Sequence, residues 1–172
     1  GIACSRSDET LQMAAAKGFL PLVHFTSSPP QIKQMLDIYM GADSGDIPAR
    51  RSRTRVARVA YVAESDEQAV MEMENAVLGS PVTSGRLDHY LPENGTRDDL
   101  TMTNLVKWDG AYIGSPDTVY EGLKNLYDEV GGFGTLLLIS GRDWGTWEQR
   151  MRSWTLFMEE VAPRLAKLDA DR

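Results

Sequence analysis

Apolar and polar residues follow two different patterns along most of this chain. Short apolar runs suit buried strands, and apolar residues three and four apart suit one face of a helix. The run over 20–25 shows little polar alternation, which is typical of a strand covered on both faces of a parallel sheet. The strands predicted in this way cover residues 2–4, 20–25, 56–63 and 135–140.

Helices are predicted between these strands. Ser7 followed by Asp8 and Glu9 is typical of a helix start, because a serine can cap the first turn and acidic residues suit its positive end. Ser28 with two prolines behind it predicts a second start. The remaining helices are predicted to begin at Ser65, after Gly114, and over 147–168, the last with an interruption near Pro163.

Two stretches show no clear period. Residues 41–50 predict a loop rich in Gly, Asp and Pro, and residues 79–112 predict an irregular insertion. A connection as long as residues 79–112 inside a domain is usually functional or disordered. The basic run at 50–55 is interpreted as a solvated entry to the next strand. Trp147 and Trp154, seven residues apart on the closing helix, are interpreted as packing residues.

Alternating strands and helices predict an α/β fold with a parallel sheet and right-handed crossovers. About four strands are half of the eight in a TIM (β/α)8 barrel, which usually has about 250 residues. The pattern alone leaves open half of a barrel or a small open α/β sheet. In the first case residues 1–172 form a single partial domain.

The start of the chain, Gly1-Ile2-Ala3-Cys4, reads as the middle of a strand, so we expect an upstream segment. A half-barrel would expose two unpaired strand edges, which is hazardous in water. We therefore expect the chain to associate with itself or with an N-terminal half that it lacks.

The composition of the chain limits the classes of molecule that it is expected to bind. The chain has 172 residues, is 42% hydrophobic and carries a formal net charge of -7. A negative surface repels phosphate backbones and anionic lipid, so nucleic acid and membrane are not expected partners. The single cysteine excludes an internal disulfide and fits a reducing cytoplasm. With two distant histidines and one cysteine, no metal-ligand spacing is present.

Candidate chemistry gathers where the first predicted strand gives way to a helix, at residues 4–10. The free N–H groups and positive dipole end of a helix suit a phosphate, and Ser5, Arg6, Ser7 and Thr10 could add donors or charge. An ordinary helix cap explains the same residues. The chain has no Gly-rich phosphate loop.

Two further side chains are candidates for a substrate pocket. His24 ends a predicted strand, at the edge where barrel active sites lie, although a packed histidine is an equal alternative. Trp144 follows the last predicted strand and could cover a bound molecule. The residues support no Ser/His/Asp or Cys/His arrangement.

Several motifs, in their order, resemble the bacterial luciferase family of flavin-dependent monooxygenases. Residues 3–10 and 14–22 are similar to its fifth strand–helix unit, and Gly114-Ser115-Pro116 resembles the entry to its penultimate helix. Residues 131–138 resemble its last strand and residues 160–165 its terminal helix. With Asp143-Trp144 between them, this ending looks like the limonene and alkane monooxygenase-like branch, and the whole chain looks like the C-terminal half of the barrel.

The resemblance implies an oxidoreductase in which reduced FMN and O2 oxygenate a small organic substrate, with a separate flavin reductase supplying the electrons. It implies that Ser7 and Thr10 hold the flavin phosphate. Arg6 stands where luciferase has a Glu, so the role of its side chain, like that of Ser5, stays open. The family's catalytic side chains belong to the first half of the barrel, so none is assigned here, and we expect this part alone to be inactive.

Two alternatives stay open at this point. One is a deazaflavin-dependent oxidoreductase on the same barrel. The other is a non-catalytic flavin-binding or structural module.

Overall fold

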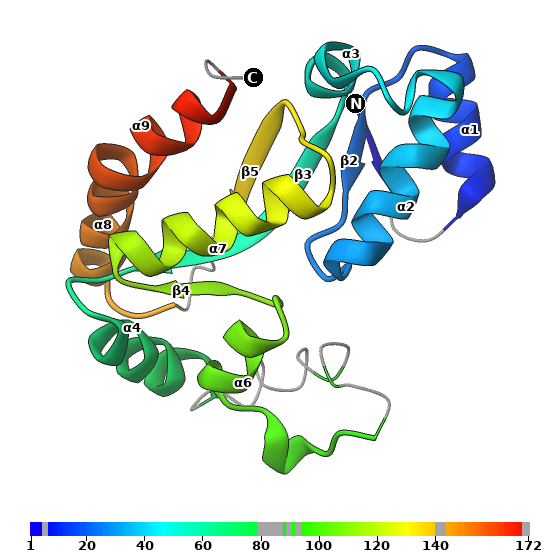
Figure 1. The fold of residues 1–172 in the computed structure, drawn as a ribbon. Helices are drawn as coiled ribbons and strands as arrows, with labels where there is room; N and C mark the ends of the chain where they lie inside the picture. The colour runs from blue at the N-terminus through cyan, green and yellow to red at the C-terminus, as the bar shows by residue number, and fades with distance from the viewer. Residues whose placement is uncertain (5–6, 79–87, 89–90, 92–93, 140–143, 170–172) are drawn as a thin grey trace. The chain divides into compact units, whose positions relative to one another are not determined.

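A computed structural model describes residues 1–4, 7–78, 88, 91, 94–139 and 144–169 (Figure 1). The chain divides into two compact units. The first comprises Gly1–Arg58 and Asn125–Ile139, and the second comprises Val59–Lys124 and Ser140–Arg172. Each unit has its own layer of strands and helices, and they are described in turn.

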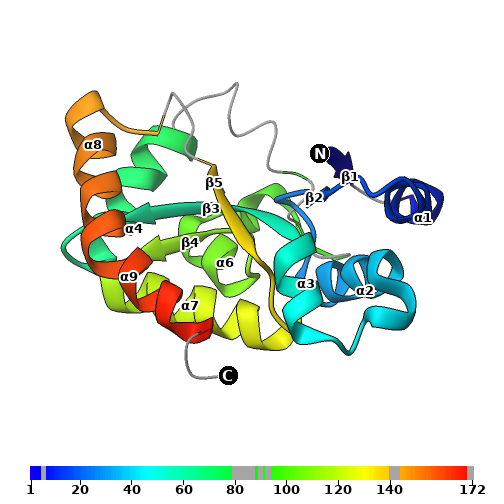
Figure 2. The same cartoon turned by 90° about the horizontal axis from the view of Figure 1, so that it is seen from above.

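The first unit contains a parallel sheet. Strand β1 (Ile2–Cys4) pairs in parallel with β2 (Pro21–Val23), as Figure 2 shows, and β2 pairs in parallel with the start of β3 (Arg55–Val62). Strand β5 (Thr135–Ile139) also pairs with β3. These strands confirm the predicted strand positions to within two residues at each end. They also confirm the parallel α/β class.

Helices of the first unit follow the predicted caps. Helix α1 (Asp8–Ala16) buries Leu11 and Ala14 and packs beside α2 (Pro29–Met40) (Figure 1). The backbone N–H of Ser28 donates to the side chain of Gln31 at 3.0 Å, which fixes the start of α2. At the other end of α2 the Tyr39 hydroxyl donates to the Phe19 carbonyl at 3.0 Å.

The basic run at 50–55 was expected to be solvated, and this expectation is wrong. Residues 41–43 form a short 3-10 helix, η1 (Gly41–Asp43), and α3 (Ile47–Arg53) follows it. Arg50 of α3 is only 2% exposed. Its guanidinium donates to Asp37 at 2.6 Å and to the Val130 carbonyl at 2.6 Å. A buried cation needs such partners, so Arg50 ties α3 to the end of α2 and to the turn after α7.

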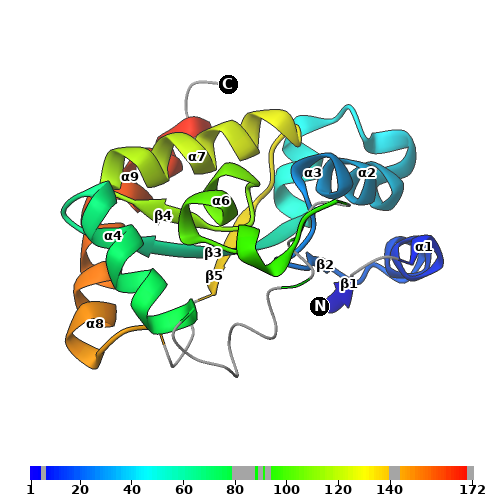
Figure 3. The same ribbon diagram turned by 90° about the horizontal axis from the view of Figure 1, so that it is seen from below.

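The second unit contains a strand that the pattern did not predict. Strand β4 (Tyr112–Gly114) pairs in parallel with the second part of β3, with Ala60 opposite Tyr112. Helices α4 (Asp66–Met73) and α6 (Met102–Lys107) pack against β4 (Figure 3). A π-helical turn, η2 (Glu74–Leu78), continues α4, and a 3-10 turn, η4 (Arg97–Asp99), precedes α6.

Part of the interval 79–112 therefore has regular structure. Helix α6 buries Met102 and Leu105, although only two apolar residues carry its inner face. So short an amphipathic segment gives no readable period. Residues 79–87, 89–90 and 92–93 lie outside the described residues, and the single-domain interpretation stays a prediction.

The start of helix α7 (Pro116–Glu129) is held by hydrogen bonds to a carboxylate of another helix. Asp66 of α4 accepts from the Ser115 backbone N–H at 2.6 Å and from the Thr118 hydroxyl at 2.9 Å. A Cβ at Gly114 would lie 2.7 Å from an Asp66 carboxylate oxygen and 2.8 Å from the Thr118 side chain. The glycine of the Gly-Ser-Pro motif is thus explained, because a side chain at Gly114 would collide with this carboxylate.

The predicted closing helix is present and is interrupted as expected. It consists of α8 (Trp147–Leu156), a π-helical segment η5 (Phe157–Val161), α9 (Ala162–Leu165) with Pro163 in its first turn, and η6 (Ala166–Asp169). The buried Ser153 hydroxyl accepts from the Val62 backbone N–H at 2.8 Å, which attaches α8 to β3.

The two tryptophans of α8 do not pack as predicted. Trp147 is 60% exposed and Trp154 is 43% exposed. The inward face of this segment is instead formed by Ser153, Phe157 and Val161.

Among the described residues, no helix combines the length and apolar character that a membrane crossing requires.

Replacing the buried Arg50 by Met tests whether it fixes the first unit. We expect Arg50→Met to lower the free energy of unfolding by about 3 kcal/mol, because the Val130 carbonyl and Asp37 both lose a charged donor. Arg53→Met is the matched control on the same helix, since Arg53 is 34% exposed and bonds Asp43 at 3.2 Å. It should cost less than about 1 kcal/mol. Chemical denaturation of both variants measures the difference, and equal losses would contradict the assigned role of Arg50.

The Asp66 contacts predict a pH dependence. The hydrogen bond from the Ser115 backbone is the largest influence on Asp66 and holds the pKa of its carboxyl below the ordinary value. Its stabilisation is therefore complete above the unfolded pKa of about 3.9 and is lost as the pH falls through the lower folded pKa.

We expect Asp66→Asn to destabilise the protein by about 1 kcal/mol at neutral pH and by progressively less below about pH 4. Denaturation at a series of pH values measures this. Glu67→Gln, an exposed carboxylate in the same helix turn, is the control and should show little change. A difference between wild type and Asp66→Asn that persists in acid would refute the assignment.

Candidate functional site

The start of α1 is the first part of the candidate site. Ser7 has an extended backbone, and its hydroxyl oxygen accepts from the Thr10 backbone N–H at 3.3 Å. The same hydroxyl donates to the Glu9 carboxylate at 2.7 Å. Ser7 is exposed and Thr10 is half-buried. Ser7 is the N-cap of α1 and Thr10 belongs to its first turn.

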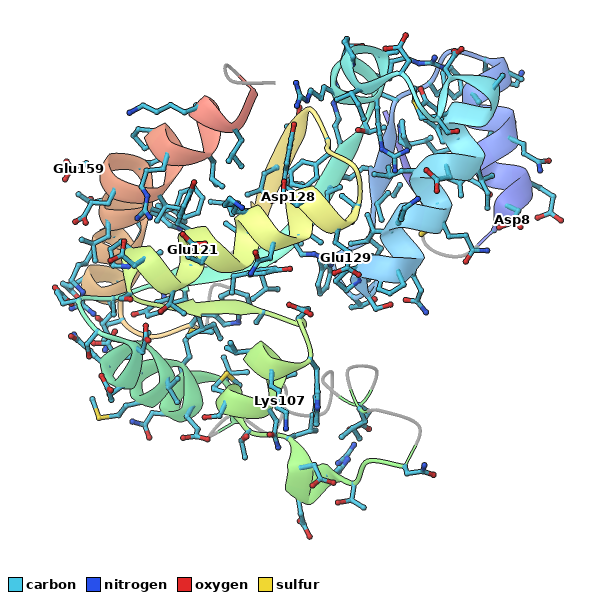
Figure 4. The ribbon with its side chains drawn as sticks, in the orientation of Figure 1. Asp8, Lys107, Glu121, Asp128, Glu129 and Glu159 are labelled. Atoms are coloured by element: carbon cyan, nitrogen blue, oxygen red, sulfur yellow. The ribbon has the colours of Figure 1, made fainter. Side chains whose placement is uncertain are left out.

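This turn has the donors that a phosphate requires. A helix of nine residues presents N–H groups and the positive end of its dipole there, and the two hydroxyls add to them. Asp8 (labelled in Figure 4) and Glu9 oppose an anion, but both side chains are exposed and can turn into water. The hydrogen bond from Ser7 is the largest of the influences that lower the pKa of Glu9. The donor set fits a phosphate, provided that the Ser7 hydroxyl turns from Glu9 to the ligand.

Ser5 and Arg6 lie outside the described residues. Their proposed part in phosphate binding stays a prediction.

His24 lies at the end of β2, as predicted. Its backbone N–H donates to the Cys4 carbonyl at 3.1 Å, so the carboxyl ends of β1 and β2 lie at the same edge. The structure thus brings His24 to the edge from which the Ser7 turn departs. Cys4 itself is buried, and burial raises the pKa of its thiol, so it stays protonated at neutral pH.

The ring of His24 is held in one orientation. Its Nδ1 lies 2.7 Å from the Thr26 hydroxyl and accepts from the Thr26 backbone N–H at 3.3 Å. Because that backbone group can only donate, the neutral imidazole carries its proton on Nε2. The ring also contacts Phe25, with centroids 4.4 Å apart. His24 is half-buried, and its ring is positioned by the neighbouring residues Phe25 and Thr26.

A residue that the sequence reasoning missed shapes this loop. Arg58 of β3 is fully buried, and its guanidinium donates to the carbonyls of Phe25 and Ser27, each at 2.6 Å. Two bonds from one planar cation fix the path of the chain between β2 and α2. The signal in the sequence was a charged residue in the middle of an apolar strand, which is unfavourable unless it has partners.

Trp144 is half-buried and belongs to the second unit. Its proposed place in a substrate pocket stays a prediction, as does that of His24.

No family model matches the chain. It is 30% identical over 124 residues to 4-hydroxyprotoasukamycin monooxygenase of Streptomyces nodosus subsp. asukaensis, which covers 66% of this chain and 31% of that protein. It is 28% identical to 3,6-diketocamphane 1,6-monooxygenase of Pseudomonas putida, over 94% of this chain and 45% of that protein.

A solved structure shares the fold. The oxygenating constituent of 3,6-diketocamphane monooxygenase from Pseudomonas putida, a type II Baeyer-Villiger monooxygenase in complex with FMN, superposes with a TM-score of 0.73. The two are 23% identical, and the match covers 94% of this chain and 47% of the other. The chain thus spans less than half the length of these relatives.

Proposed function

We propose that this chain, which belongs to the luciferase-like, flavin-dependent monooxygenase family, supplies the flavin-phosphate site and part of the substrate pocket of such an enzyme. The observation that carries the proposal is the capped start of α1. There the Ser7 hydroxyl accepts from the Thr10 backbone N–H in the first turn of a helix, and this helix follows the parallel strand β1 in the sequence. The carboxyl edge of the strands is where barrel enzymes hold their ligands.

FMN is the cofactor that the proposal implies. The family's monooxygenases include one solved in complex with FMN, and the donors at Ser7 and Thr10 fit its phosphate. When bound, the reduced flavin supplies the electrons with which O2 oxygenates a small organic substrate. A separate flavin reductase is the proposed source of those electrons.

The proposed role of the chain's own residues is to bind the flavin and to orient it. Ser7 and Thr10 hold the phosphate, and Ser5 and Arg6 are proposed to add donors from the same turn. His24, whose Nε2–H is fixed by the Thr26 contact at Nδ1, is proposed to form a polar part of the pocket wall. Trp144 is proposed to cover the bound molecule and to help exclude water, which protects reactive flavin species from side reactions.

A deazaflavin-dependent oxidoreductase is the alternative activity. It would bind its cofactor through a similar phosphate turn but would transfer a hydride without consuming O2. O2 uptake that depends on reduced FMN, together with a product heavier by one oxygen atom, supports the monooxygenase. A non-catalytic module would bind flavin and give neither result.

Substitution of Ser7 by Asp separates the role of this residue as a helix cap from its proposed role in phosphate binding. Aspartate is as good a helix cap as serine, so stability should stay within about 0.5 kcal/mol of wild type. Its charge repels a phosphate, so we expect the dissociation constant for FMN to rise at least about tenfold, or 1.4 kcal/mol. Thr10→Val should weaken FMN binding in the same direction. Quenching of flavin fluorescence measures both.

Two controls make this experiment specific. Riboflavin has the flavin ring without the phosphate, so its affinity should not change in Ser7→Asp protein. Thr146→Asp replaces the matching cap of α8, where the Thr146 hydroxyl accepts from the Gln149 N–H at 3.2 Å, and should leave FMN binding unchanged. Unaltered FMN affinity in both Ser7→Asp and Thr10→Val would refute the phosphate site.

A further inference from the structure

The turn between β2 and α2 carries the half-buried side chains of His24, Phe25 and Thr26. It is a tight turn, because the Ser27 backbone N–H donates to the His24 carbonyl at 3.3 Å. It leaves the sheet at the carboxyl end of β2, where the His24 N–H bonds the Cys4 carbonyl of β1 at 3.1 Å. Barrel enzymes carry their ligand-binding loops at this edge of the sheet. The His24–Ser27 turn therefore belongs to the part of the first unit in which a ligand is expected.

Two backbone carbonyls of this turn are held by one side chain of the neighbouring strand. The Arg58 guanidinium donates through Nη1 to the Phe25 carbonyl and through Nη2 to the Ser27 carbonyl, each at 2.6 Å. Arg58 is fully buried in β3. Two donors on one rigid planar group fix both carbonyls relative to each other, which a flexible ammonium group cannot do. In the strand ladder Val23 lies opposite Val56, so Arg58 continues the contact between β2 and β3 beyond the paired residues.

The backbone of the turn is thus bonded within the fold. The Thr26 N–H bonds His24 Nδ1 at 3.3 Å, and the two carbonyls bond Arg58. The rings of His24 and Phe25 lie with their centroids 4.4 Å apart and their planes tilted by 34°. Because both rings are attached to this backbone, their placement depends on Arg58.

We propose that Arg58 is a positioning residue: it holds the His24–Ser27 turn so that the rings of His24 and Phe25 meet the flavin ring in one fixed arrangement. This inference rests on the proposed function, in which this edge of the sheet binds FMN. A pocket wall that is ordered before binding loses less conformational freedom when the ligand arrives, which raises the affinity. A buried cation is unfavourable without partners, and the two carbonyls that bond Arg58 both belong to this turn.

The place of the turn favours contact with the flavin ring over contact with the phosphate. Neighbouring strands lie about 4.8 Å apart, so the end of β2 is next to the end of β1, after which the chain continues to the Ser7 cap. A flavin whose phosphate is bound at Ser7 has its ring system within reach of the neighbouring turn. The His24 and Phe25 rings offer aromatic surface to a planar ring system there.

The affinities of the full chain for two flavins test the proposal. Arg58→Met removes both donors, so we expect the dissociation constants for FMN and for riboflavin to rise by a similar factor, at least about fivefold. The factor is shared because both ligands have the same ring. Arg58→Lys keeps the charge without the two fixed donors and should give a smaller rise for both. Quenching of flavin fluorescence measures the four constants.

Arg50→Met is the matched control. Arg50 is also a buried arginine of the first unit with bonds of 2.6 Å, but its helix α3 leads into the amino end of β3, at the opposite edge of the sheet. It should destabilise the protein and leave both flavin affinities unchanged, under conditions in which circular dichroism shows each variant folded. Hydrogen exchange at the Thr26 amide should become faster in the Arg58 variants and not in Arg50→Met. If Arg58→Met does not fold, Arg58→Lys carries the test.

The possible outcomes separate this role from the proposed function. Unaltered affinity for both flavins in the Arg58 variants, or an equal loss in Arg50→Met, would overturn the positioning role. A loss of FMN affinity alone would show that Arg58 acts on the phosphate through its charge, and would overturn it too. Ser7→Asp, measured beside them, tests the phosphate site independently. A wild-type chain that binds neither flavin would overturn the proposed function and the role of Arg58 with it.

Discussion

Strand β3 is the element to which the other strands attach, since β2, β4 and β5 all pair with it and β1 reaches it through β2. Every residue from Val56 to Val62 is buried, and this strand contributes to both units. A strand so enclosed has to satisfy all its backbone and polar groups internally. The Ser153 hydroxyl bonds the Val62 N–H, and two loop carbonyls bond the terminal nitrogens of the Arg58 guanidinium. The positions of α8 and of the His24 loop follow from these requirements.

Elements of the fold could be predicted from the sequence where the contacts that determine them are between residues close in the chain. The cap at Ser7, the start of α2 at Ser28 and the course of β3 are decided within a few residues, and the sequence pattern located them. Helix α3 was missed because its basic residues resemble a solvated run. Arg50 can be buried because Asp37 and the Val130 carbonyl, 13 and 80 residues away, accept hydrogen bonds from its guanidinium.

The same distinction applies to the candidate site. A strand followed by a capped helix placed Ser7 and Thr10 correctly in one turn, and His24 correctly at a strand end. Arg58 escaped because its partners, the Phe25 and Ser27 carbonyls, lie more than 30 residues away and are backbone groups that the sequence does not distinguish. The two tryptophans of α8 were misjudged for a related reason. Periodicity identifies an apolar face, but it does not say whether another part of the same chain covers that face.

The geometry of the Ser7 turn also limits what it can contribute to flavin affinity. Its hydroxyl proton is already given to Glu9 at 2.7 Å, so a phosphate gains that proton only by replacing an existing acceptor. Asp8 and Glu9 place two negative charges in the first turn, where they already complement the helix dipole. The gain from the phosphate is therefore reduced by the Ser7–Glu9 bond that it replaces. In the proposed function this turn sets the position of the flavin, and its contribution to affinity is the difference between the phosphate and the Glu9 carboxylate as acceptors for the Ser7 hydroxyl.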